Sequence, residues 1–174
     1  MSALFTLMPP RRAPLFVLVL AVATIGGALF FEYVLGYIPC ALCLEQRWPY
    51  YAAIPLVILG LIVSREANLG HWPTWLMTVV GVIFLVSAAL GLRHMGVEWG
   101  WWAGPSGCGG TGGMAGSIDD LNAALAGAKI VPCDKPAWTF LGLSLAGYNF
   151  LVSLVLAAAS FVPAYATWKE RHEV

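Results

Sequence analysis

Residues 14–35 read PLFVLVLAVATIGGALFFEYVL, an apolar run in which Glu32 is the only charged residue. Three further apolar runs follow at residues 41–63, 72–92 and 140–168. A helix needs about 20 apolar residues to cross the hydrocarbon core of a bilayer. Because lipid leaves no partner for an unpaired backbone group, such runs must be helices. The sequence therefore predicts an all-α membrane protein, a four-transmembrane-helix bundle that forms a single integral membrane domain over residues 1–174.

The composition agrees with a chain that lives in lipid. Hydrophobic residues make up 60% of it, charged residues make up 10%, and the mean hydropathy is +0.79. A soluble chain carries about 25% charged residues. The formal net charge is zero, which argues against a nucleic-acid partner. A cleaved signal peptide is the alternative interpretation of residues 14–35, but the run is longer than the roughly 7 to 15 residues of such a segment and no small-residue cleavage site follows it.

One long polar segment, residues 93–137, separates the third and fourth runs. Within it, residues 104–116 read GPSGCGGTGGMAG, and this glycine-rich sequence predicts a flexible tether around Cys108. Residues 117–128 (SIDDLNAALAGA) predict a short amphipathic helix on the membrane surface. The segment is thus expected to be a loop outside the bilayer that carries one short helix.

Basic residues set the expected orientation of the bundle. Four spans place both termini on one side, where the basic residues are Arg11, Arg12, Arg65, Lys169 and Arg171, and the other side holds Arg47, Arg93, Lys129 and Lys135. The count favours cytoplasmic termini because the long loop itself contributes only two lysines. All four cysteines then lie on the far side, where disulfides persist.

The four cysteines form two pairs. Cys40 and Cys43 are spaced Cys-Ala-Leu-Cys directly after Pro39, and Cys108 and Cys133 lie in the long loop. A C-x-x-C sequence at a helix N-terminus favours a thiolate and fast thiol–disulfide exchange. The alternatives are a structural disulfide, inert buried thiols or, with less support, a structural zinc site, since the loop pair is not a second C-x-x-C.

Two polar residues lie at the depth of Cys43. Arg47 follows Cys43 by four residues, so on a helix both side chains occupy the same face, and the guanidinium is expected to stabilise a Cys43 thiolate. Snorkelling to lipid headgroups is the alternative for Arg47. His94, after the third run, is either a hydrogen-bond donor to a lipophilic ligand or a plain interfacial histidine. Glu45 and Gln46 are interpreted as solvated residues of the first helical turn.

These motifs together resemble the DsbB family of bacterial inner-membrane, quinone-dependent thiol oxidases. The similarity rests on Pro39-Cys40-Ala41-Leu42-Cys43 with Gln46-Arg47, on His94, on Cys108 and Cys133, and on Trp138-Thr139-Phe140-Leu141-Gly142-Leu143. It covers nearly the whole chain. The glycine-rich stretch around Cys108 and the residues Leu-Glu-Gln at 44–46 depart from the family pattern, which bears on partner docking more than on the electron path.

The resemblance implies a role for each matching residue. Cys40 and Cys43 are the membrane-proximal disulfide, with Cys43 facing a quinone, either ubiquinone or menaquinone, beside Arg47 and His94. Cys108 and Cys133 are the loop disulfide, and Cys108 forms the mixed disulfide with a DsbA-like periplasmic thiol oxidase. Electrons then pass from that partner through both pairs to the membrane quinone pool.

Two other functional classes stay open at this level. A reductase resembling vitamin K epoxide reductase would run related chemistry in the opposite direction, but with its membrane C-x-x-C later in the helical order. A non-enzymatic membrane scaffold would use its disulfides only to brace the loop. Four cysteines also allow three pairings, so the sequence leaves the connectivity open.

Overall fold

The structure is a computed structural model that describes residues 9–10, 12–64, 72–105 and 129–172. Its long helices are α2 (Ala13–Tyr33), α4 (Trp48–Val63), α5 (Trp72–Glu98) and α7 (Leu145–His172), and a short helix, α3 (Ala41–Glu45), precedes α4. Four helical segments are long and apolar enough to cross a membrane, with α3 and α4 together forming the second. The predicted four-helix membrane bundle is confirmed.

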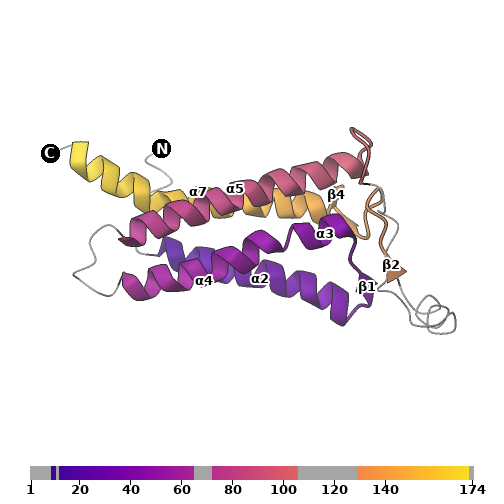
Figure 1. Cartoon of the computed structure of the whole chain (residues 1–174), viewed down its shortest axis with the longest axis horizontal. Coiled ribbons are helices and arrows are strands. Elements are labelled where there is room, and N and C mark those ends of the chain that lie inside the picture. Colours follow the sequence, from indigo (N-terminus) through magenta and orange to yellow (C-terminus); the bar gives the residue numbers. More distant parts are fainter. Residues whose placement is uncertain (1–8, 11, 65–71, 106–128, 173–174) are drawn as a thin grey trace.

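The helices lie side by side along one axis, and consecutive spans run in opposite directions (Figure 1). The start of α2 and the end of α7 lie at one end of the bundle. At the opposite end lie α3 and three two-residue strands, β1 (Tyr37–Ile38), β2 (Lys129–Ile130) and β4 (Leu143–Ser144). The C-x-x-C sequence therefore lies at the end of the bundle opposite the two termini.

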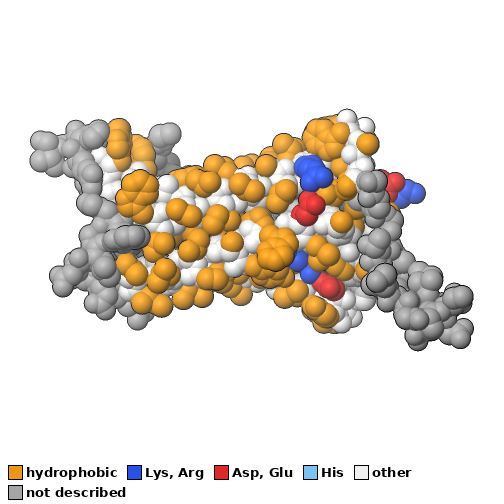
Figure 2. Space-filling view, viewed as in Figure 1, with side chains coloured by type: hydrophobic (Ala, Val, Ile, Leu, Met, Phe, Trp, Pro, Cys, Tyr) orange, Lys and Arg blue, Asp and Glu red, His pale blue; other side chains and the backbone are white. Residues whose placement is uncertain are grey.

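Burial separates an internal core from a lipid-facing surface. Tyr50, Met77, Phe84 and Leu156 are buried where the helices meet. Large apolar side chains are also exposed on the outer helix faces, among them Val19, Ile58, Val82 and Val155. Figure 2 shows hydrophobic side chains over most of the visible face, with the charged side chains gathered towards one end. A helix that is apolar on all sides is typical of a membrane span, so the chain is a multi-pass membrane protein.

Helices α5 and α7 approach closely at Gly91. A Cβ atom at this position would lie 2.9 Å from the backbone nitrogen of Phe150 on α7. Small residues allow helix backbones in membranes to come this near. By contrast, a Cβ at Gly26 of α2 would meet nothing within 4 Å.

Gly91→Ala is therefore expected to lower the free energy of unfolding by about 1–3 kcal/mol, the cost of overpacking a close contact. The backbone of Phe150 cannot turn aside as a side chain could, so α5 and α7 must separate. Thermal unfolding in detergent measures the effect. Gly26→Ala is the matched control and should be neutral; equal stability of the two variants would contradict the assigned packing.

The helix boundaries differ from the predicted ones at three places. The second span is interrupted between Glu45 and Trp48. The third continues to Glu98, beyond the predicted residue 92, so the loop begins later than residue 93. The fourth begins at Leu145 instead of residue 140, because β3 (Thr139–Phe140) pairs with β4 in an antiparallel hairpin. The predicted amphipathic helix at residues 117–128 lies outside the described residues.

The hairpin has a local cause. Leu141 has φ 49° and Gly142 has φ 80°. Two consecutive residues with positive φ form the tight turn that joins antiparallel strands, and glycine adopts this conformation without strain. The apolar composition of residues 140–144 concealed this turn.

Strand β2 brings the returning end of the long loop to the first cysteine pair. It pairs in parallel with β1, Tyr37 opposite Lys129 and Ile38 opposite Ile130. The backbone N–H of Val131 donates to the carbonyl of Ile38 at 3.4 Å. Since β1 ends two residues before Cys40, this pairing fixes the loop beside the C-x-x-C sequence.

Candidate active site

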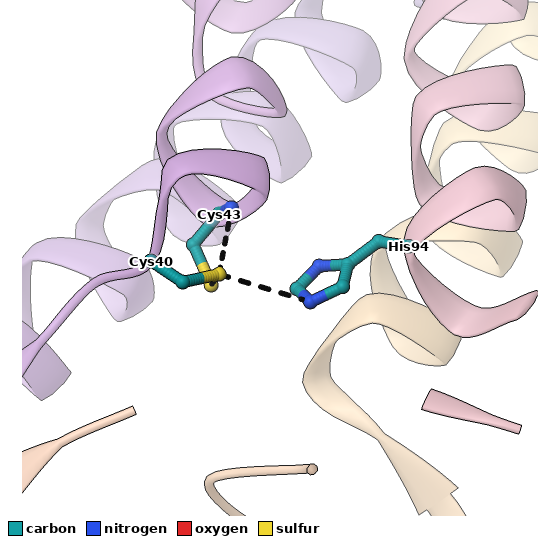
Figure 3. A group of neighbouring side chains, drawn as sticks. All are labelled: Cys40, Cys43 and His94. Carbon is teal, nitrogen blue, oxygen red and sulfur yellow. Dashed lines mark hydrogen bonds between the residues drawn. The ribbon is translucent and has the colours of Figure 1, made fainter. Parts of the chain in front are cut away.

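The cysteine pair opens the second span. Cys40 is the N-cap of α3, in an extended conformation with φ −72° and ψ 169°, and its Sγ accepts a hydrogen bond from the backbone N–H of Cys43 at 3.2 Å. The two sulfur atoms are 2.7 Å apart and both residues are free thiols. From α5, the ring of His94 points at the pair, with Nε2 3.8 Å from the Cys40 sulfur (Figure 3).

These contacts favour the thiolate form of Cys40. The pKa of Cys40 lies well below that of an ordinary thiol, chiefly because the Cys43 side chain donates a hydrogen bond to it, with further donation from His94 and from the Cys43 backbone. Burial of Cys40 acts in the opposite direction and is outweighed. Thiolates stabilised in this way are the reactive species in thiol–disulfide exchange.

A pH titration of the reduced pair tests this assignment. In a Cys108→Ala, Cys133→Ala background, the ultraviolet absorbance of the thiolate is expected to rise at a pH well below about 8.5, the ordinary pKa of cysteine. A lowered pKa means that the proton is lost earlier as the pH increases, so the step lies on the acid side. Adding Cys40→Ala should remove that step. A first step near the ordinary value would contradict the assignment.

The two sulfurs of the pair face different surroundings. Cys40 belongs to a buried cluster with Leu42, Val97 and Cys133, to which β2 delivers the loop. Cys133 is disulfide-bonded and 1% exposed, whereas Cys108 lies outside the described residues. Cys43 instead lines a cavity. One cysteine of the pair is thus placed next to a loop cysteine and the other next to open space inside the bundle.

That cavity has a volume of about 290 Å³ and lies among α2, α4, α5 and α7. Its apolar wall includes Ile25, Ala28, Phe31, Leu145 and Val152, and its polar groups include Glu32, Cys43, Gln46, Arg47, Tyr50, His94, Glu98, Tyr148 and Asn149. An apolar pocket with a few convergent polar groups is the usual form of a small-molecule site.

Arg47 lies in the wall of the same cavity as Cys43. Gln46 and Arg47 separate α3 from α4, but both keep right-handed helical backbone angles. The Arg47 guanidinium forms an ion pair with the Glu32 carboxylate of α2, and both side chains are largely buried. Glu32, which was not among the predicted site residues, is therefore the partner that holds Arg47 in the cavity. A charge inside an apolar span was the signal that could have identified it.

Gln46 corrects one expectation. It is 7% exposed and therefore is not a solvated residue, while Glu45 is exposed and pairs with Arg93 at 2.9 Å. The Gln46 side chain lies 2.6 Å from His94 Nδ1 and accepts a hydrogen bond from Asn149 of α7 at 2.7 Å. Gln46 lies four residues after Leu42 and four before Tyr50, which are both buried, so it belongs to the inward face of the second span.

A buried polar chain continues from Asn149 into the core. Tyr50 donates to Asn149 Oδ1 at 2.7 Å and lies 3.2 Å from Ser153, which in turn donates to Ser87 at 2.9 Å. Ser153 and Ser87 are fully buried. Polar residues inside apolar spans mark functional or specific packing sites. Asn149 and Ser153, four residues apart in the fourth span, are therefore the feature of the sequence that points to this chain.

The cluster of Cys40, Cys43 and His94 also resembles a metal site, because its ligand atoms lie within 4.8 Å of one another. A histidine that binds metal through Nε2 normally donates its other N–H, on Nδ1, to an acceptor. Here Nδ1 faces the amide nitrogen of Gln46, which is a donor. The ring is therefore set up against metal binding through Nε2, and the residues do not fit a zinc ion.

Trp138 lies where the loop re-enters the bundle. Its ring stacks on that of Phe140, with the ring centroids 5.8 Å apart, and meets the ring of Phe31 edge-on, with the centroids 6.0 Å apart. Phe31 also lines the cavity, so Trp138 connects the β3–β4 hairpin to the cavity wall.

Comparison with known proteins agrees with these features. The family described as "Disulfide bond formation protein DsbB" matches residues 10–163. Proteins named "Disulfide bond formation protein B" from Methylococcus capsulatus (strain Bath) and Acidovorax sp. (strain JS42) are 31% and 29% identical, over 90% and 88% of this chain and 95% and 86% of their own lengths. "Disulfide bond formation protein B 1" of Pseudomonas entomophila is 32% identical over 84% of both chains. No solved structure gives a significant match. The chain therefore belongs to the DsbB family of membrane disulfide-bond formation proteins, and its activity is that of a disulfide oxidoreductase.

Proposed function

We propose that this protein reoxidises a DsbA-like periplasmic dithiol oxidase and passes the electrons, through two cysteine pairs, to a membrane quinone. The observation that supports it best is the division within the C-x-x-C pair: Cys40 clusters with the loop residue Cys133, and Cys43 lines the cavity. A pair that relays electrons needs one sulfur facing the donor and one facing the acceptor.

The exchange steps balance as follows. The partner's dithiol reduces a Cys108–Cys133 disulfide and becomes a disulfide itself. The Cys133 thiolate then attacks Cys40 in the Cys40–Cys43 disulfide, and Cys43 leaves as a thiolate. Cys108 attacks Cys133, which restores the loop disulfide and releases Cys40. Two electrons and two protons have moved from the partner to the membrane pair, and each step is a thiolate displacement at sulfur.

The cavity fits a quinone by its chemistry. A quinone accepts two electrons and two protons and has an apolar ring with two carbonyl acceptors. The apolar wall suits the ring, Arg47 supplies donors, and His94 lies in the same wall beside the expected ring. Glu98 offers a buried carboxylate oxygen with no hydrogen-bond partner among the described residues, suited to a hydroxyl of the reduced form.

The energetics require an oxidant of this class. A DsbA-like couple is near −120 mV, and glutathione at about −220 to −260 mV cannot take its electrons spontaneously, since each 30 mV opposes a two-electron transfer by about 1.4 kcal/mol. A quinone is reached only from within the membrane. We accordingly propose the bacterial inner membrane as the location, with both termini cytoplasmic and the cysteines periplasmic.

The direct test supplies purified protein in detergent with a reduced DsbA-like protein and a soluble quinone analogue, and follows quinone absorbance and partner thiols together. One quinone should be reduced for each partner disulfide formed. A membrane scaffold would leave both reagents unchanged, and that result would overturn the proposal.

A further inference from the structure

The Gln46 amide makes three hydrogen bonds that together fix its orientation. Its nitrogen donates to the backbone carbonyl of Leu42 at 3.2 Å and lies 2.6 Å from His94 Nδ1, and its oxygen accepts from Asn149 Nδ2 at 2.7 Å. Exchanging the amide oxygen and nitrogen would set an acceptor against the Leu42 carbonyl, which can only accept. The amide nitrogen must therefore face His94.

This orientation decides which His94 nitrogen carries the proton. Both amide hydrogens are used, one towards Leu42 and one towards Nδ1, so Nδ1 must accept. In a neutral imidazole the other nitrogen is then the donor. The titratable groups at Nε2 are the Cys40 sulfur and Glu98 Oε1, each 3.8 Å away.

We propose that Gln46 is a positioning residue that holds His94 as the Nε2–H tautomer and so aims a hydrogen-bond donor at the Cys40 sulfur. The proposal rests on the proposed function in one respect: the donor matters because Cys40 is the sulfur released when the loop disulfide re-forms. A leaving thiolate departs faster when its charge is stabilised. The Nε2–H group supplies that stabilisation without adding a positive charge to the buried site.

Gln46→Glu and Gln46→Leu form a matched pair of variants. Both lose the amide donor to Leu42, but glutamate offers Nδ1 an acceptor and leucine offers nothing. The nitrogen NMR spectrum of labelled histidine reports which ring nitrogen is protonated. The signals of His94 are identified by their absence from the spectrum of His94→Asn. We expect the unaltered protein to show an unprotonated Nδ1 and a protonated Nε2.

Gln46→Glu is expected to protonate Nδ1, and Gln46→Leu to give mixed tautomers. Glu45→Gln, an amide–carboxylate exchange at the exposed neighbouring residue, is the control and should leave the spectrum unchanged. A protonated Nδ1 in the unaltered protein, or a Gln46→Glu spectrum identical to it, would overturn the proposal. Thermal unfolding confirms that each variant is folded.

The Cys40 thiolate gives a second measurement. In the reduced Cys108→Ala, Cys133→Ala background, Gln46→Leu should lower the thiolate fraction at a given acid pH by about tenfold, the scale of one charge-assisted hydrogen bond. An unchanged fraction in Gln46→Leu would refute the link to Cys40. These samples contain neither quinone nor partner. If the protein does not reduce quinone, the tautomer and thiolate measurements keep their meaning. If either of those measurements fails, the quinone-reduction assay still tests the proposed function independently.

Discussion

Cys43→Ser is expected to abolish quinone reduction, by a factor of at least about 10³, the scale of losing a nucleophile. Cys43 is the cysteine of the membrane pair that lines the cavity, while Cys40 is buried in the cluster with Cys133. When the pair gives its two electrons to the quinone, Cys40 and Cys43 must form a disulfide, and a serine hydroxyl cannot do so. Quinone absorbance, recorded with reduced partner present, measures the loss.

The same variant should bind the quinone as before, because serine is close in size to cysteine and the apolar wall from Ile25, Phe31 and Val152 is unchanged. Binding measured by tryptophan fluorescence separates a chemical defect from a lost site. Quinone reduction by Cys43→Ser at the rate of the unaltered protein would exclude the C-x-x-C pair from the electron path.

The second large effect is expected in Cys108→Ser. This variant cannot form the loop disulfide, so oxidation of the DsbA-like partner should fall by at least about 10³, again the scale of removing an exchanging sulfur. Cys40, Cys43 and the cavity remain. A small dithiol such as dithiothreitol, which can reach the membrane pair without the loop, should still drive quinone reduction in this variant.

Comparing the DsbA-like partner with dithiothreitol as reductant shows which cysteine pair the substitution affects. Loss of partner oxidation with retained dithiothreitol-driven activity places Cys108 on the partner side of the relay. Equal loss with both reductants would indicate that Cys108 is required for the membrane site itself. Retained partner oxidation would show that the partner attacks a different cysteine. In that case Cys133→Ala, which leaves Cys108 unpaired and able to hold the partner in a mixed disulfide, would trap no covalent complex.

The four-helix architecture could be predicted from the sequence because it follows from a single constraint. Long apolar runs such as residues 14–35 must be helical in lipid whatever they contact, so length and hydropathy suffice. The Cys-Ala-Leu-Cys spacing likewise indicates a reactive pair without tertiary information, since Pro39 and the helix start act locally on Cys40.

The neighbours of each site residue were decided only by the tertiary structure. Local spacing predicted that Arg47 would lie near Cys43, but it could not show that Arg47 pairs with Glu32 of α2 or that Gln46 meets His94, forty-eight residues away along the chain. The placement of Cys133 beside Cys40 likewise depends on the β1–β2 pairing. Hydropathy and periodicity describe how each segment meets its solvent, whereas hydrogen bonds between polar groups buried in an apolar bundle depend on which helices are adjacent and on their rotation, and these are set by packing over the whole chain.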